Sequence, residues 1–138
     1  MARQTILEKY QLAFVEFLLL AKRNIIEIGG RHGLTPMQLL ALLALDEPRS
    51  MHELTSVFYC DPSNVTGIID GLEHKNLAAR SENPADRRIK MIGLKRKGTD
   101  IRSILVDELA GDDSYILAKL SKREAKTFIN LVQKIVKD

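Results

Sequence analysis

Ser63, Asn64 and Thr66 are short polar residues whose side chains could read the edges of DNA bases. Asparagine can pair with adenine through two hydrogen bonds, hydroxyl groups both donate and accept, and the threonine methyl can contact the methyl of thymine. The other interpretation is that these residues form the ordinary polar surface of a capped helix, because residues of these types begin most helices. The secondary-structure elements predicted around these residues distinguish the two interpretations.

A second candidate group is basic. From His74 to Gly98 the chain carries eight Lys or Arg residues and two acidic residues, a net charge of +6, whereas the rest carries 13 basic and 16 acidic residues, a net charge of −3. A basic segment on a faintly acidic body is typical of a polyanion-binding surface. The alternative is a solvated loop, because charged blocks of this size are common.

Within this segment, Asp86, Arg87 and Arg88 fall at the tip of a predicted hairpin. Arginine fits a narrow minor groove, because its planar cation matches the strong negative potential there. Asp86 stands two residues before Arg88, close enough to hold that guanidinium in one direction. The alternative is a plain surface salt bridge, which would contribute little to stability.

Hydrophobic periodicity predicts long helices at both ends of the 138-residue chain. Apolar residues recur at spacings of three and four from Thr5 to Ile28, and Gly29-Gly30 is expected to end that helix. Its apolar stripe is wider than one core face needs, so a second subunit is a natural cover. The final helix also carries a continuous apolar stripe, made of Phe128, Leu131, Val132, Ile135 and Val136.

Capping signals predict the starts of the helices. A hydroxyl residue followed three positions later by Gln or Glu marks helix starts at Thr35, Ser50 and Ser121. Asp61 before Pro62 marks a further start, with the Asp61 side chain as the cap and the proline in the first turn.

Two of these helices form a candidate helix-turn-helix, over residues 50–58 and 61–75, with Tyr59-Cys60 as the turn. In that motif the N-terminal residues of the second helix meet base edges in the major groove, which is where the three short polar residues fall. Two short, partly alternating segments, 77–82 and 89–94, then predict a β-hairpin whose tip is the basic loop.

The helix-turn-helix, hairpin and flanking helices together resemble the multiple-antibiotic-resistance regulator (MarR) family of transcription factors, over nearly the whole chain from about residue 5. The segment from Asp61 to Arg80 is similar to the recognition helix and the start of the wing in that family. Asp86-Arg87-Arg88 resembles the family's Asp-x-Arg wing signature, and residues 94–98 resemble the Leu-Thr-x-x-Gly motif that begins the next helix. The chain departs from the pattern at Gly67, where a long polar or basic side chain is frequent, at Asn76, where Gly is usual, and at Lys95, where Thr is usual.

The resemblance implies a mainly α fold with a small β-hairpin wing. One domain would span residues 1–138, with the winged helix-turn-helix at about 35–98 and dimerisation helices at about 5–29 and 99–138. The implied function is sequence-specific binding of double-stranded DNA by a homodimeric repressor, with two recognition helices roughly 34–36 Å apart on a pseudo-palindromic operator and release by a small aromatic or phenolic ligand. The implied DNA contacts are Ser63, Asn64, Thr66, Arg80, Arg87 and Arg88, with Asp86 as the support of the wing.

Cys60 is the single cysteine of the chain. Its place before the recognition helix, near the positive end of the helix dipole, could make the thiol a redox sensor. A buried, inert thiol that packs the helix-turn-helix is the other interpretation. A lone cysteine excludes an internal disulfide. The histidines have no ligand spacing with one another or with Cys60, so we predict neither a metal site nor a cofactor.

Several functional classes are disfavoured. The chain shows no nucleophile elbow, no phosphate-binding glycine loop and no paired carboxylates near a histidine, so we do not expect an enzyme. It has neither a run of about 18 apolar residues nor the apolar region of a signal peptide, so a cytoplasmic protein without a membrane span is expected. The remaining alternative is a winged-helix module that binds protein or RNA without regulating transcription. RNA readers stack bases on exposed Phe or Tyr, and we expect the aromatic residues of this chain mostly on helix core faces, which favours duplex DNA.

Overall fold

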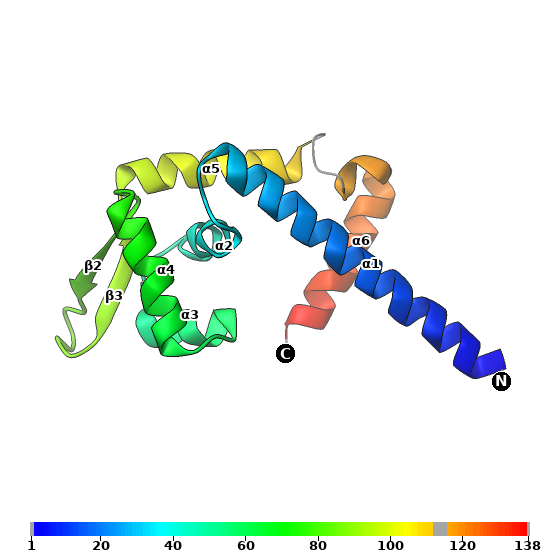
Figure 1. Ribbon diagram of the computed structural model, residues 1–138, viewed down its shortest axis with the longest axis horizontal. Helices are drawn as coiled ribbons and strands as arrows, with labels where there is room; N and C mark the ends of the chain where they lie inside the picture. Colours follow the sequence, from blue (N-terminus) through cyan, green and yellow to red (C-terminus); the bar gives the residue numbers. More distant parts are fainter. Residues whose placement is uncertain (1, 112–115, 138) are drawn as a thin grey trace. The chain divides into compact units, whose positions relative to one another are not determined.

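The protein is mainly helical, with one small antiparallel sheet, in a computed structural model that describes residues 2–111 and 116–137 (Figure 1). The elements are α1 (Ala2–Arg31), α2 (Pro36–Ala44), β1 (Arg49–Ser50), α3 (Met51–Phe58), α4 (Pro62–His74), β2 (Ala78–Glu82), β3 (Lys90–Leu94), α5 (Arg96–Ala110), a short 3-10 helix (Leu117–Lys119) and α6 (Lys122–Val136). The predicted class, mainly α with a β-hairpin, is confirmed.

The chain divides into two compact units. One consists of Met1–Asn24 with Glu108–Asp138, and the other of Ile25–Asp107. The second unit holds the helix-turn-helix and the hairpin, and it extends beyond the expected range of about 35–98 at both ends. Among the helices that the structure describes, none combines the length and the apolarity that a bilayer span requires.

The predicted capping boxes are present at three helix starts. At Thr35, Ser50 and Ser121 the hydroxyl oxygen accepts from the backbone N–H three residues on, and the side-chain oxygen of the Gln or Glu there accepts from the backbone N–H of the cap. Asp61 is different, since it occupies the N-cap position of α4 but its side chain makes no capping hydrogen bond. Its carbonyl oxygen instead accepts from the N–H groups of Asn64 and Val65, so the predicted side-chain cap is wrong.

The end of α1 also differs from the prediction. The helix continues through Gly29 and Gly30 to Arg31, and the left-handed residue that turns the chain is Gly33, with a φ of 66°. Gly29 is needed for a close approach, because a Cβ there would lie 3.1 Å from the carbonyl oxygen of Leu34. Glycine lowers helix propensity by about 1 kcal/mol, and in α1 tertiary packing outweighs that preference.

The core of the second unit lies between the helix-turn-helix, α2 and the sheet. Its largest fully buried side chains are Leu39, Leu42, Leu54, Val65, Ile69, Leu72, Leu77, Ile92 and Leu105. The sheet has the antiparallel order β1-β3-β2, and Arg80 of β2 stands opposite Ile92 of β3. The hairpin is therefore confirmed, whereas β1 was not predicted, because two residues are too short to show any alternation.

The segment after α4 contains two positions at which the sequence departs from the family pattern. Asn76 has a φ of 61°, the left-handed conformation for which Gly is usual. Its side-chain oxygen accepts a hydrogen bond of 2.5 Å from Nζ of Lys95, the residue that replaces the usual Thr before α5. The two departures thus contact each other, and together they link the end of α4 to the start of α5.

The first unit has apolar faces that one chain leaves uncovered. The rings of Phe17 on α1 and Phe128 on α6 pack edge to face, with centroids 5.5 Å apart. Many other large apolar side chains of these two helices are exposed: Ile6, Tyr10, Leu12, Phe14, Val15, Leu18, Leu19, Leu131, Val132, Ile135 and Val136. Assembly of two chains over these faces stays a prediction.

Candidate nucleic-acid interface

The N-terminal part of α4 is an exposed polar surface. Val65, Ile69 and Leu72 bury one side of the helix in the core, and the structure places Ser63, Asn64 and Thr66 together on the exposed remainder. The hydroxyl of Thr66 donates to the carbonyl oxygen of Pro62 at 3.0 Å, so its oxygen remains available to accept a further hydrogen bond. Among the described residues, the side chains of Ser63 and Asn64 have no hydrogen-bond partner.

Gly67 extends this surface without adding a side chain. A Cβ built there meets nothing within 4 Å, so the position faces open space. The backbone of α4 is bare at this point, and a flat molecule could approach it closely. Glycine at this position therefore lets another molecule contact the helix backbone closely. A long polar side chain would instead supply additional polar contacts.

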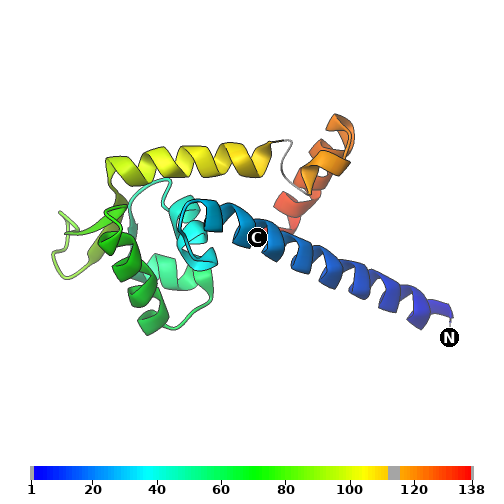
Figure 2. The same ribbon diagram turned by 45° about the horizontal axis from the view of Figure 1, so that its top comes forward.

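The wing tip is an ordered loop between β2 and β3. The N–H of Asn83 donates to the carbonyl of Ile89 at 2.9 Å, and the Asn83 carbonyl accepts from the N–H of Asp86 at 3.2 Å. The side-chain oxygen of Asn83 also accepts from the N–H of Ala85 at 2.9 Å. The turned view shows this loop extending beyond the strands (Figure 2). Sequence reasoning missed the role of Asn83, although Asn before Pro is a turn signal.

Asp86 holds Arg88 in the predicted manner. Its Oδ1 accepts from the backbone N–H and from Nε of Arg88, and its Oδ2 accepts from Nη2, all at 3.1 Å. The hydrogen bonds from Arg88 keep the pKa of the Asp86 carboxyl below its ordinary value, and the same contact raises the pKa of Arg88. The Arg88 side chain is 91% exposed, so the guanidinium is oriented while remaining open to a ligand.

Arg87 is a second exposed cation on the wing. Its side chain is 89% exposed, and its Nε lies 4.0 Å from Oε2 of Glu82, too far for a hydrogen bond. Nζ of Lys90, on the neighbouring strand, lies 3.5 Å from the other oxygen of Glu82. The wing therefore has cationic side chains that its acidic residues do not bind closely.

Arg80 is placed differently from the other predicted DNA contacts. It projects from β2 toward α4, where Nη2 donates to Oδ1 of Asp70 at 2.7 Å and Nη1 donates to Oε1 of Glu73. Burial acts to lower the pKa of Arg80, but the hydrogen bonds and charges of both carboxylates outweigh it, so the pKa is raised. The structure brings this residue to the flank of the recognition helix and pairs it there, which the sequence did not predict.

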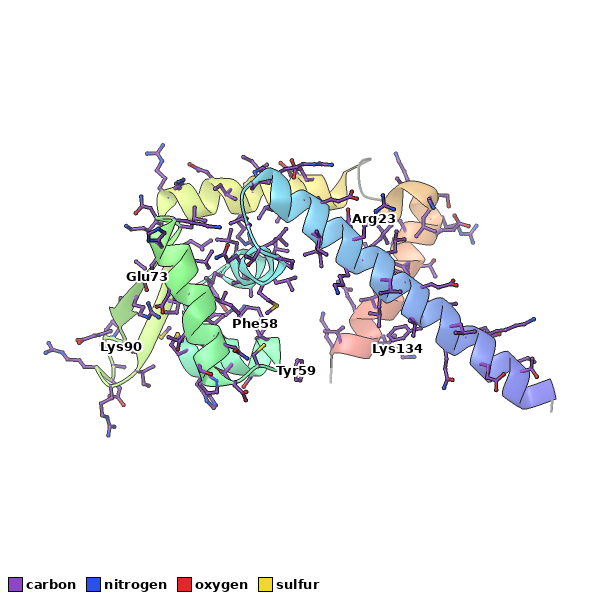
Figure 3. The ribbon with its side chains drawn as sticks, viewed as in Figure 1. Arg23, Phe58, Tyr59, Glu73, Lys90 and Lys134 are labelled. Carbon is purple, nitrogen blue, oxygen red and sulfur yellow. The ribbon has the colours of Figure 1, made fainter. Side chains whose placement is uncertain are left out.

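The turn before α4 contains the lone cysteine and an unusual tyrosine. Cys60 is half-buried, and its thiol donates to the carbonyl oxygen of Phe58 at 3.2 Å. Tyr59 is 97% exposed and has a φ of 50°, the left-handed conformation that ends α3. Figure 3 shows its ring projecting from the turn. The expectation that the aromatic residues lie mostly on core faces is wrong here and at Tyr10 and Phe14, which are also exposed.

The part of the chain that the structure describes has no metal-binding cluster. Over residues 2–111 and 116–137, no group of three or more His, Cys, Asp or Glu side chains is arranged to hold a metal ion. The chemistry that the described site can perform is therefore hydrogen bonding by short polar side chains and charge pairing by arginines.

Comparison with known proteins shows similarity to one family. A sequence model of the MarR family matches residues 34–90, from just before α2 to the first residue of β3. The chain is 34% identical over 98 residues to the transcriptional repressor MdtR of Bacillus subtilis, which covers 70% of this chain and 61% of MdtR. It is 23% identical over 109 residues to the transcriptional regulator MhqR of the same organism, with 76% and 74% of the two chains covered. Both relatives are named as transcriptional regulators.

Solved structures show the same fold. YusO of Bacillus subtilis matches with a TM-score of 0.66 at 24% identity, covering 97% of this chain and 96% of that one. A mutant MarR of E. coli in complex with operator DNA matches with a TM-score of 0.69 at 23% identity, covering 90% and 91%.

Proposed function

A sequence model of the MarR family matches residues 34–90, and we propose that this chain is a transcriptional regulator of that family that binds duplex DNA through the N-terminal end of α4 and the wing. The observation that carries the proposal is that both surfaces belong to one compact unit, Ile25–Asp107. Ser63, Asn64 and Thr66 are short enough for α4 to sit in a major groove and reach base edges. Arg87 and Arg88 suit the adjacent minor groove or backbone.

Two chains would act together. The exposed apolar residues of α1 and α6 are more numerous than the single apolar residues scattered over an ordinary protein surface, and a second copy of the chain would cover them. A dimer would place two α4 helices on successive major grooves, roughly 34–36 Å apart, and would read a pseudo-palindromic site. One of the relatives is named a repressor, so occlusion of an operator is the proposed mode of action. A cytoplasmic location is proposed with it, because the protein would act on DNA.

Release of the operator is proposed to follow binding of a small aromatic or phenolic effector. A ligand with unequal affinity for two arrangements of the dimer would shift the population away from the one that fits DNA. Oxidation of Cys60 is the other mode of release considered. Its half-buried thiol is already bonded to the Phe58 carbonyl, which favours a packing role for it.

The test begins with the purified protein and genomic fragments. Sedimentation gives the number of chains, and selection of bound fragments gives a duplex. On that duplex, Asn64→Ala should lower discrimination against random DNA by a factor of about 5 to 150, the range for one lost base contact. Arg88→Ala should weaken binding without changing the dimer or the fold, whereas Arg31→Ala, which removes an exposed cation at the end of α1, should have little effect. A monomer that selects no fragment at low salt would contradict the proposal.

A further inference from the structure

The ion pairs between β2 and α4 have a consequence for the recognition surface. Asp70 and Glu73 lie three residues apart, and therefore on one face of α4. Arg80 reaches this face from the first strand of the wing and donates to both carboxylates, through Nη2 to Asp70 at 2.7 Å and through Nη1 to Glu73. Figure 3 labels Glu73 on the side of α4 that adjoins the sheet. One guanidinium thus ties two helix residues to the wing.

The arrangement is more than an ordinary surface salt bridge. The planar guanidinium uses two different nitrogens on two different partners, which fixes its direction as well as its position. The Arg80 side chain is 29% exposed, against 89% for Arg87 and 91% for Arg88. It is therefore the arginine of these three that is least available to a phosphate.

We propose that Arg80 is a positioning residue, which clamps the wing to the recognition helix and so sets where Arg87 and Arg88 meet DNA. The clamp also neutralises part of the negative charge that Asp70 and Glu73 bring to α4. Without Arg80, the helix proposed to enter the groove would carry two unpaired carboxylates. The structural part of this inference concerns the free protein, and its effect on DNA binding rests on the proposed function.

Wing mobility in the free protein is the direct readout. A nitroxide is attached at the exposed loop position 85, with Ala85→Cys in a Cys60→Ser background, and its spectrum reports motion of the wing tip. Arg80→Gln should increase that motion. The pair Asp70→Asn with Glu73→Gln should increase it as well, although Arg80 is intact, because the anchors are gone. Arg31→Ala, which also removes one exposed cation of the same unit, should leave the spectrum unchanged.

The DNA measurement separates positioning from direct contact. Loss of a phosphate contact lowers the slope of log affinity against log salt by about 0.9. Arg80→Gln should weaken binding by at least about 3-fold, since the wing must then be ordered on binding, while the slope stays the same. Arg87→Ala, which removes an exposed cation, should lower the slope.

The outcomes are distinct. Increased motion in both clamp variants supports the proposal, provided that thermal melts show the variants folded. Unchanged motion in both variants overturns the proposal. If the slope against salt is also lowered for Arg80→Gln, Arg80 contacts a phosphate directly instead. The helix variants replace exposed or half-exposed carboxylates by amides of the same shape, so they keep the test valid if Arg80→Gln does not fold. The spectra are recorded without DNA. A protein that binds no duplex would therefore refute the proposed function, while the spectra would still show whether Arg80 holds the wing to α4.

Discussion

Removal of Asp86 sets two physical effects against each other. Asp86→Ala deletes a negative charge from a surface proposed to face phosphates, which by itself should strengthen binding. At separations of about 10 Å through water and salt, that gain is less than about 2-fold. The same change deletes the acceptor of all three 3.1 Å hydrogen bonds that orient Arg88.

The loss of orientation should be the larger effect. The Arg88 side chain is 91% exposed, so without the carboxylate it samples many rotamers and must be ordered again when it enters a groove. Ordering one long side chain on binding weakens affinity by about 2- to 10-fold. We therefore expect Asp86→Ala to bind the selected duplex about 2- to 5-fold more weakly than the parent, in a fluorescence anisotropy titration near physiological salt.

Glu82→Ala is the matched control. It removes a carboxylate from the same wing, but one that lies 4.0 Å from Arg87 and 3.5 Å from Lys90 and orients neither closely. Its affinity should rise by less than about 2-fold. If Asp86→Ala also tightens binding, Arg88 is not oriented by Asp86 in any way that matters to DNA, and the reasoning is refuted.

The same contact predicts a pH dependence. Arg88 lowers the pKa of Asp86 below the ordinary 3.8, so the contribution of this pair to stability is complete above that value. It is lost as the pH falls through the lowered pKa, because protonation removes the charge that accepts these bonds. Between pH 5 and pH 8, therefore, no step in affinity should arise from Asp86.

Two stability predictions follow from single backbone positions. A Cβ on Gly98 would lie 2.0 Å from the carbonyl oxygen of Leu77, so Gly98→Ala should lower the free energy of unfolding, measured in urea, by at least about 1–3 kcal/mol. Gly67 has open space around it, so Gly67→Ala should not lower the free energy of unfolding. Equal effects of the two substitutions would contradict the packing argument. Tyr59→Gly should raise the free energy of unfolding by up to about 1 kcal/mol, because relief of a left-handed residue is worth about 1–2 kcal/mol and the entropy of glycine cancels part of it. Tyr59→Ala keeps the Cβ and should bring no such gain.

Features that depend on neighbouring residues could be predicted from the sequence. The capping boxes at Thr35, Ser50 and Ser121 involve partners three positions apart, and all three are present. The bond between Asp86 and Arg88 spans two residues and is present as well. In such cases the chain geometry leaves few alternatives, so pattern and structure agree.

Features decided by tertiary packing could not be predicted. Arg80 was grouped with the DNA contacts because its charge is visible in the sequence, whereas its two carboxylate partners are brought to it only when β2 packs beside α4. Gly29-Gly30 was expected to end a helix by propensity, yet the packing of Gly29 against Leu34 lets α1 continue. Tyr10 and Phe14 belong to the apolar stripe predicted for the first helix, but both are exposed on α1 in the single chain.

Footprinting of the selected duplex tests the placement of α4 and the wing most directly, with dimethyl sulfate, which methylates guanine N7 in the major groove, and with hydroxyl radicals, which attack sugars reached from the minor groove. We predict two major-groove patches protected from methylation, separated by about one helical turn of 10–10.5 base pairs, each flanked by protection of minor-groove sugars that Arg88→Ala removes. Protection that is absent, or that keeps the same flanks in Arg88→Ala, would contradict the assignment of α4 to the major groove and of the wing to the groove beside it.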